Sequence, residues 1–273
     1  MIPSKHSAPR VVITGIGAIT PLGLNAADTW QNLVNGTSAI GRISHFDSSA
    51  LPVHIAAEVN DFEPTQFMPS KEARRMSRPT QFAVATAAQA VRDAGLALPF
   101  PDDLAMRSGV LIGTAMGGFD KAEQGVKDYA RGLNRVNPFN LPASSPNLST
   151  FHVCVALNAQ GYTNTVSTAC SAGTMALSEA AEVIKRGECD IMIAGGTEAH
   201  INELTIVGFI AMRALSTQNR APDEASRPFD ANRDGFVLGE GAAIFVLESL
   251  SHALNRGATI YAEILGAAHS SDT

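Results

Sequence analysis

The sequence predicts an α/β protein, with helices on both faces of a largely buried sheet. Two observations support this prediction. Short runs rich in valine and isoleucine alternate along the chain with longer segments that carry helix-capping residues. The 273 residues are also 45% hydrophobic, which is enough for a large core in one large domain or two small ones.

Each predicted strand is a short apolar run bounded by glycine or by small polar residues. The five strands are expected at residues 10–17, 108–115, 164–167, 190–195 and 242–248. A further run, residues 260–267, opens with the same pattern. Because strands and helices alternate, these runs are expected to share one sheet that helices cover on both sides.

The predicted helices begin after capping residues or end at glycine. Asn25 is the expected N-cap of the first helix, with Asp28 in its first turn and Gly36 as its stop signal. Residues 79–94 form a second helix that Gly95 closes. Further helices are expected at residues 149–158, 171–185, 204–211 and 249–256. Loops are expected at residues 45–69, 137–147 and 218–233, which are irregular, proline-rich or polar.

Composition and charge exclude several classes of function. The net charge of −6 and a pI near 5.6 argue against general nucleic-acid binding. The three cysteines, Cys154, Cys170 and Cys189, form no CxxC pair, which argues against a disulfide framework and a zinc site. The N-terminus MIPSKHSAPR has no signal-peptide run, and every apolar stretch is far shorter than the roughly 20 residues of a membrane span. We expect a cytoplasmic protein that binds neither nucleic acid nor membrane.

Gly15 and Gly17 follow the first predicted strand, so a dinucleotide-binding loop has to be considered. That fingerprint needs a glycine or alanine three positions further on, where this chain has Thr20, followed by Pro21. We therefore interpret the two glycines as a tight turn.

The strongest candidate for chemistry is Cys170, in the stretch TACSAG (168–173). A strand precedes it and a helix is expected from Ser171, which places the sulfur at a helix N-terminus. Unpaired N–H groups and the positive end of the helix dipole stabilise a thiolate there, and the N–H groups can also hold an oxyanion. Small neighbours leave room for an acyl group. From spacing alone, a buried structural cysteine remains the alternative.

Four longer stretches resemble the β-ketoacyl-[acyl-carrier-protein] synthases, and among them the elongating synthase II type. They are RVVITGIGAITPLG (10–23), NTVSTACSAGTMAL (164–177), IMIAGGTEA (191–199) and ALSTQNRAPDEASRPFDANRDGFVLGEGAAIFVLE (214–248). The resemblance covers essentially the whole chain and implies a thiolase-like fold, with helices around a five-stranded mixed sheet. Residues 1–250 would form the N-terminal synthase domain, and residues 251–273 would begin a second, similar domain that is mostly absent.

The resemblance also implies an activity, the decarboxylative Claisen condensation of fatty acid elongation. Cys170 matches the nucleophile that accepts an acyl chain from acyl carrier protein, and its own N–H would be one oxyanion donor. No resident cofactor is implied, since the phosphopantetheine arrives on the carrier. The family's two catalytic histidines and a phenylalanine–glycine gating loop belong to the second half, and His269 is not in their motif. We expect the chain alone to be inactive in condensation, either as a truncated synthase or as one half of a two-chain enzyme.

Other positions match the family's substrate and carrier contacts. Met116 in TAMGG and Phe209 match the lining of the acyl pocket, with ordinary core packing as the alternative. Basic positions near the mouth of the site, which would steer the acidic carrier, match Lys71, Arg74, Arg75, Arg135 and Arg213. The alternative for residues 71–75 is a solvated helix face.

Relatives dimerise through the strand before the nucleophile, so we expect a homodimer in which the strand from Asn164 to Ser167 pairs with its copy. Two departures lie near this strand. Phe151, before His152, stands where relatives have a small residue, and Tyr162 replaces a proline, so both bear on pocket length.

Three other functions remain as alternatives. The block from ALST to LGEGA argues against a degradative thiolase or a chalcone-synthase-like enzyme. A non-catalytic partner like a chain-length factor would typically lack the cysteine, which is present here. A polyketide ketosynthase is not separable from synthase II on this sequence.

Overall fold

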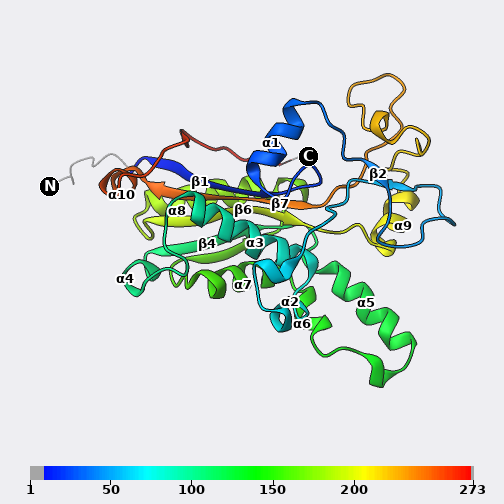
Figure 1. Ribbon diagram of the computed structural model, residues 1–273, viewed down its shortest axis with the longest axis horizontal. Helices are drawn as coiled ribbons and strands as arrows, with labels where there is room; N and C mark the ends of the chain where they lie inside the picture. Colours follow the sequence, from blue (N-terminus) through cyan, green and yellow to red (C-terminus); the bar gives the residue numbers. More distant parts are fainter. Residues whose placement is uncertain (1–8, 272–273) are drawn as a thin grey trace.

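The computed structural model describes residues 9–271, and its centre is one six-stranded sheet with helices on both faces (Figure 1). The sheet contains β1 (Val11–Ile19), β4 (Ser108–Gly113), β5 (Thr163–Val166), β6 (Ile191–Glu198), β7 (Gly241–Ser249) and β8 (Ala262–Glu263). Their order across the sheet is β5-β4-β6-β7-β1-β8. The described residues do not include residues 1–8 and 272–273. The prediction that the N-terminus contains no signal peptide therefore falls mainly outside them.

The directions of these strands make the sheet mixed, as the resemblance implied. β4 runs parallel to β5 and β6, whereas β7 runs antiparallel to β6 and β1. All five predicted strands lie in this sheet. The resemblance implied five strands, and the sixth, β8, lies within the further run predicted at residues 260–267 and pairs with Val12 and Ile13 at the edge. A separate small sheet pairs β2 (Gly41–Arg42) with β3 (Ile55–Ala56). β2 precedes the predicted loop at residues 45–69, and β3 lies inside it.

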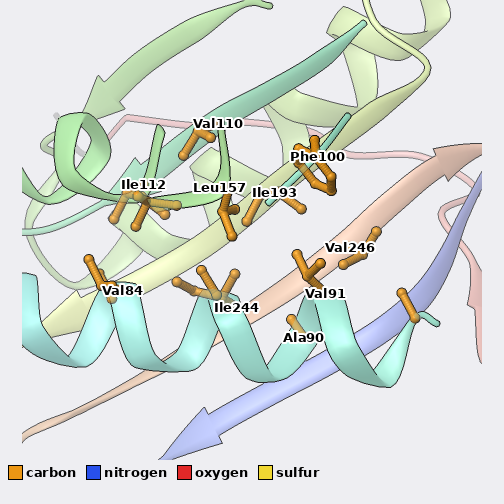
Figure 2. Close-up of a cluster of buried hydrophobic side chains, with 14 of the residues drawn as sticks. Val84, Ala90, Val91, Phe100, Val110, Ile112, Leu157, Ile193, Ile244 and Val246 are labelled. Carbon is orange, nitrogen blue, oxygen red and sulfur yellow. The ribbon is translucent and has the colours of Figure 1, made fainter. Parts of the chain in front are cut away.

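Helices pack on the two faces of the sheet because strand side chains alternate between them. α3 (Arg78–Asp93) and α7 (Leu148–Leu157) cover one face, and α8 (Ala172–Lys185) covers the other. Along β4, Val110 and Ile112 pack toward α3 and α7, whereas Leu111 packs with the α8 side chains. Figure 2 shows Val84 and Val91 of α3 against the strand side chains of the first face.

Gly15 and Gly17 lie inside β1, so the interpretation as a tight turn was wrong. Each glycine lies under the backbone of α3. A Cβ on Gly15 would overlap the carbonyl of Ala90, and a Cβ on Gly17 would overlap the carbonyl of Thr86. The pair is therefore explained by close helix–sheet contact, a requirement of tertiary packing that a local pattern does not distinguish from a turn.

Most predicted helices are confirmed to within a few residues. α1 (Ala26–Val34) has Asn25 as its N-cap, which accepts from the Asp28 N–H at 2.8 Å. α9 (Glu203–Ala211) and α10 (Leu250–Asn255) also lie where they were expected. Among the described residues, no helix is both long and apolar enough to cross a membrane.

Several helices were missed in the sequence analysis. α5 (Phe119–Ala130) had no predicted counterpart, and α6 (Asn140–Ser144) interrupts the expected loop at 137–147. α5 projects from the body of the molecule (Figure 1), and Glu123 is its one buried residue. Its apolar residues Phe119, Ala122, Val126 and Tyr129 recur at helical spacing, so the signal of an amphipathic helix is present in the sequence and was overlooked. The remaining short elements are η1 (Pro64–Gln66), α2 (Ser70–Ala73), α4 (Asp102–Ala105), η2 (Leu133–Arg135), η3 (Ala169–Ser171) and η4 (Pro222–Glu224).

Candidate active site

Cys170 lies in η3, between the end of β5 and the start of α8, and it is exposed. The preceding residue, Ala169, has a φ of +49°, in the left-handed region that residues with a Cβ seldom adopt. Backbone strain of this kind persists where the surrounding structure holds it, and it is frequent at functional sites. Here it accompanies the sharp turn that sets Cys170 on the wall of a hollow of about 480 Å³.

Glycines let α8 approach the ends of β4 and β6 closely. A Cβ on Gly113 would overlap the backbone carbonyl of Ala172, in the first turn of α8. A Cβ on Gly196 would lie 3.0 Å from the Cα of Gly173. Because β4 and β6 are parallel, their carboxyl ends meet beside this turn, a frequent location for binding sites in α/β proteins. The small residues thus determine the position of Cys170.

The two other cysteines have different environments. Cys154 on α7 is partly buried, and burial raises the pKa of its thiol. Cys189, before β6, is buried, and burial likewise raises the pKa of its thiol. The alternative of a buried structural cysteine therefore describes Cys189 rather than Cys170.

The sequence analysis missed Glu198, at the end of β6. Its carboxylate accepts from the Ala115 N–H at 2.6 Å and from the Thr114 hydroxyl at 3.3 Å. The Thr114 hydroxyl in turn accepts from the Gly117 N–H at 3.0 Å, and the Ser167 hydroxyl donates to the Ala115 carbonyl at 3.2 Å. Glu198 thus anchors the turn between β4 and α5. The sequence did contain a signal for this role, because Glu198 is an acidic residue at the end of the apolar run in IMIAGGTEA (191–199).

Two further ionisable side chains, His200 and Glu240, line the Cys170 hollow. The His200 Nδ1 lies 3.3 Å from a Glu198 oxygen. Glu240 is already engaged, since it accepts from the Arg78 guanidinium at 2.7 and 2.8 Å and from the Val59 N–H at 2.8 Å. His200 and Glu198 are therefore the ionisable groups beside Cys170 that have no guanidinium partner.

Met116 and Phe209 come together although they are far apart in the sequence. Both line an apolar hollow of about 360 Å³ between the start of α5 and α9. Its other lining residues are Phe119, Leu204, Thr205, Gly208 and Met212. Met116 directly follows Ala115, which lines the Cys170 hollow, so the two hollows lie on either side of one turn.

The five predicted carrier-docking residues lie in three places. Lys71 and Arg74, on and just after α2, are exposed, and the Arg75 guanidinium stacks over Phe139 at 4.5 Å. Arg135 is exposed in η2, beyond α5. Arg213 follows α9 and lines a different hollow.

The remaining candidates lie away from both hollows. His152 is half-buried, and burial lowers its pKa. His269 bonds Ser178 in α8 at 3.1 Å. Phe151 lines a hollow beside β5, and Tyr162 donates to Glu179 at 2.7 Å. Neither Phe151 nor Tyr162 lines the hollow of Met116 and Phe209, so this arrangement does not support their expected influence on pocket length.

Comparisons with known proteins place this geometry in a family. The family model of the β-ketoacyl synthase N-terminal domain matches residues 8–253. The chain belongs to the β-ketoacyl synthase family. Its similar curated relatives include 3-oxoacyl-[acyl-carrier-protein] synthase 2 of Staphylococcus aureus strain N315, 45% identical over 258 residues, 94% of this chain and 62% of the relative. The Synechocystis synthase 2 is 45% identical over 265 residues, 96% of this chain and 63% of the relative.

Solved structures show the same ketosynthase fold. A β-ketoacyl synthase from Burkholderia phymatum STM815 has a TM-score of 0.84 at 34% identity and matches 94% of this chain and 63% of its own. The ishigamide ketosynthase/chain length factor has a TM-score of 0.85 at 34% identity and matches 95% of this chain and 63% of its own. This ketosynthase chain therefore spans somewhat under two thirds of the length of these relatives.

Proposed function

We propose that the chain carries the nucleophile of a 3-oxoacyl-[acyl-carrier-protein] synthase that acts in fatty acid elongation. The observation that supports this most directly is the exposed Cys170, at a strained turn on a hollow where the parallel strands β4 and β6 end. The 45% identity to synthases of this name supports the same conclusion.

In the first step, the Cys170 thiolate attacks the carbonyl carbon of an acyl thioester on acyl carrier protein. A sulfur–carbon bond to Cys170 forms, and the bond to the phosphopantetheine sulfur breaks, so the carrier thiol leaves with a proton. The oxyanion of the tetrahedral intermediate would be held by backbone N–H groups of η3 and the start of α8, the Cys170 N–H among them.

In the second step, malonyl-carrier protein loses CO₂, and the resulting carbanion attacks the Cys170 thioester. A carbon–carbon bond forms, and Cys170 is released as the thiolate. We assign the first step to this chain and expect it to be inactive in the second, which needs the two histidines of the family's second half. The phosphopantetheine of the carrier serves both steps, and we propose no resident cofactor.

The acyl chain would occupy the hollow of Met116 and Phe209. This hollow is almost entirely apolar, and it shares the Ala115–Met116 turn with the Cys170 hollow, so an acyl chain on Cys170 has an apolar surface beside it. The carrier would dock on the basic residues Lys71, Arg74, Arg75, Arg135 and Arg213. Because the chain has a net charge of −6, such a local basic surface would direct an acidic partner.

We also propose a homodimer through β5. This strand is at the edge of the sheet and pairs with β4 alone, and its Thr163 and Asn164 are exposed. An uncovered edge strand readily pairs with a second strand. Antiparallel pairing across a two-fold axis would extend the sheet through both protomers. We place the protein in the cytoplasm, where its three free cysteines stay reduced.

Acylation of Cys170 tests the proposed function. The purified chain is incubated with acyl-[acyl-carrier-protein], and peptide mass spectrometry follows the acyl adduct. We expect an adduct on Cys170 and none in the Cys170→Ala variant. Incubation with malonyl-carrier protein should release no CO₂ above the rate of that variant. Absence of an adduct on Cys170, or adducts spread over all three cysteines, would contradict the proposal.

A polyketide ketosynthase remains the second candidate function, because the ishigamide ketosynthase/chain length factor is as similar in fold as the Burkholderia synthase. A non-catalytic partner subunit is the weaker alternative, because Cys170 is present and exposed. Acylation of Cys170 by carriers from the two pathways, measured side by side, distinguishes these candidates.

A further inference from the structure

A third hollow, of about 480 Å³, lies after the end of α9 and is lined by arginines. Residues 213–214, 226–228 and 233–236 contribute its lining, and backbone hydrogen bonds connect the first of these segments with the last. The Phe236 N–H donates to the Ala214 carbonyl and the Ser216 N–H donates to the Phe236 carbonyl, both at 3.0 Å. Arg213, Arg227 and Arg233 line the hollow. We call it the arginine hollow.

Arg227 and Asp234 form a rigid wall of the arginine hollow with no net charge. The Arg227 guanidinium donates to Asp234 at 3.0 Å and to the carbonyls of Glu224 and Asn232. Asp234 also accepts from the Thr217 N–H at 2.9 Å, which together with its other bonds holds the pKa of its carboxyl below the usual value. Asp234 is the acidic residue of the lining, and Arg227 neutralises it.

Arg213 and Arg233 carry positive charge that the lining does not neutralise. Arg233 donates to one group, the Asp230 carbonyl at 2.8 Å. Within the described part of the chain, the Arg213 side chain makes no hydrogen bond or ion pair. The Arg213 backbone has a φ of +55°, an uncommon conformation for a residue with a Cβ. Guanidinium groups favour phosphate, to which they can donate two parallel bonds.

The arginine hollow adjoins both parts of the proposed active site. Its Phe236 packs edge to face on Phe209 of the apolar hollow, with ring centroids 5.3 Å apart. Gly239, three residues after Phe236, lines the Cys170 hollow. Three residues of extended chain span about 10 Å. The arginine hollow and the Cys170 hollow are therefore neighbours, so a long, flexible ligand whose thioester lies at Cys170 could extend its phosphate into the arginine hollow.

We propose that Arg213 and Arg233 bind the phosphate of a phosphopantetheine arm while its thioester lies at Cys170. This inference rests on the proposed function and extends it from the carrier surface to one chemical group of the arm. The phosphate can come from a carrier-bound arm or from coenzyme A, since both contain phosphopantetheine.

Direct binding tests the phosphate subsite without requiring catalysis. The purified chain is titrated with 4′-phosphopantetheine and, separately, with pantetheine, by isothermal calorimetry at low salt. We expect the phosphorylated compound to bind at least about tenfold more tightly, and the preference to weaken in 0.5 M salt, where the Debye length is about half its physiological value. Arg213→Gln and Arg233→Gln should each remove most of the preference.

Arg131→Gln is the matched control, because it removes the same charge from an exposed arginine after α5, outside the arginine hollow. Equal affinity for the two compounds overturns the inference, and so does an equal loss in Arg131→Gln and Arg233→Gln. Coenzyme A and holo-carrier protein, used as competitors, show which source of the phosphate binds better.

The proposed function is assayed in parallel through acylation of Cys170 by an acyl pantetheine, which has no phosphate. If Cys170 is acylated but the phosphate preference is absent, the subsite is wrong and the proposed function stands. If the preference is present but Cys170 is never acylated by acyl pantetheine or acyl carrier, the proposed function is wrong and phosphate recognition stands.

Discussion

α8 and α5 both border the candidate active site, but they are held in different ways. α8 buries one face on the sheet, and glycines let its first turn contact β4 and β6. α5 projects from the body with one buried residue, and its Val126 and Tyr129 are 69% and 65% exposed. The nucleophile is thus placed by the core, whereas the helix that follows the acyl-pocket turn depends on a few polar contacts. Segments with few buried contacts open most easily.

The largest expected difference in stability is between a glycine substitution beside α8 and one on α5. In Gly113→Ala the new Cβ overlaps the Ala172 carbonyl, so we expect a loss of about 2–3 kcal/mol in the free energy of unfolding, as for overpacked cores. In Gly125→Ala, on α5, the Cβ lies 3.6 Å from Asn140, so the better helix propensity should make the change neutral or stabilising by about 0.5–1 kcal/mol. Urea denaturation measures both. Equal losses would mean that α5 is as tightly packed as α8.

The next largest effect is expected at Glu198, which holds the turn between β4 and α5. Glu198→Gln keeps the shape but removes the charge that holds the Ala115 N–H, so we expect a loss of about 1–2 kcal/mol. The turn that carries Met116 should loosen, and amide exchange at residues 114–118 should accelerate. Lys127→Ala, which removes the half-exposed Lys127 contacts to Glu123 and Glu203, is the control on α5 and should change stability by under about 1 kcal/mol. Unchanged exchange at residues 114–118 would rule out this role for Glu198.

Thiol alkylation compares the turn before α8 with the buried framework around it. Cys170 should react with iodoacetamide at least about tenfold faster than Cys154 and Cys189, because it is exposed and burial raises the pKa of the other two thiols. A mass-spectrometric time course at pH 7.5 follows each site. In guanidinium chloride the three rates should converge. Similar rates in the folded protein would show that the hollow does not expose Cys170.

The smallest expected effect is a pH dependence at the base of α5. Burial raises the pKa of the Asp120 carboxyl, whose Oδ2 accepts from the Arg78 N–H at 3.2 Å. A raised folded-state pKa stabilises the fold below the unfolded pKa, and this contribution is lost as the pH rises through the folded value. α5 should therefore exchange its amides faster as the pH rises through that range, after correction for intrinsic exchange. Asp120→Asn should remove the dependence, and a dependence that persists in this variant must come from another group.

Local patterns in the sequence were sufficient for the framework around Cys170. Apolar runs predicted the strands of the main sheet, and Asn25 predicted the start of α1 correctly, since capping and alternation act over a few residues. The motif around Cys170 also identified the turn between a strand and a helix. The resemblance to a family added the pairing of Met116 with Phe209, which no local pattern contains.

Only the tertiary structure decided the contacts between segments that are distant in sequence. Glu198 meets Ala115 because β4 and β6 are paired in register, which brings together residues more than 80 positions apart. Gly15 and Gly17 are explained by the path of α3 across β1, which places each glycine against a backbone carbonyl of the helix. In each case the stabilising contacts come from residues elsewhere in the chain. Local propensity does not contain these contacts, so only tertiary packing could decide the structure at these positions.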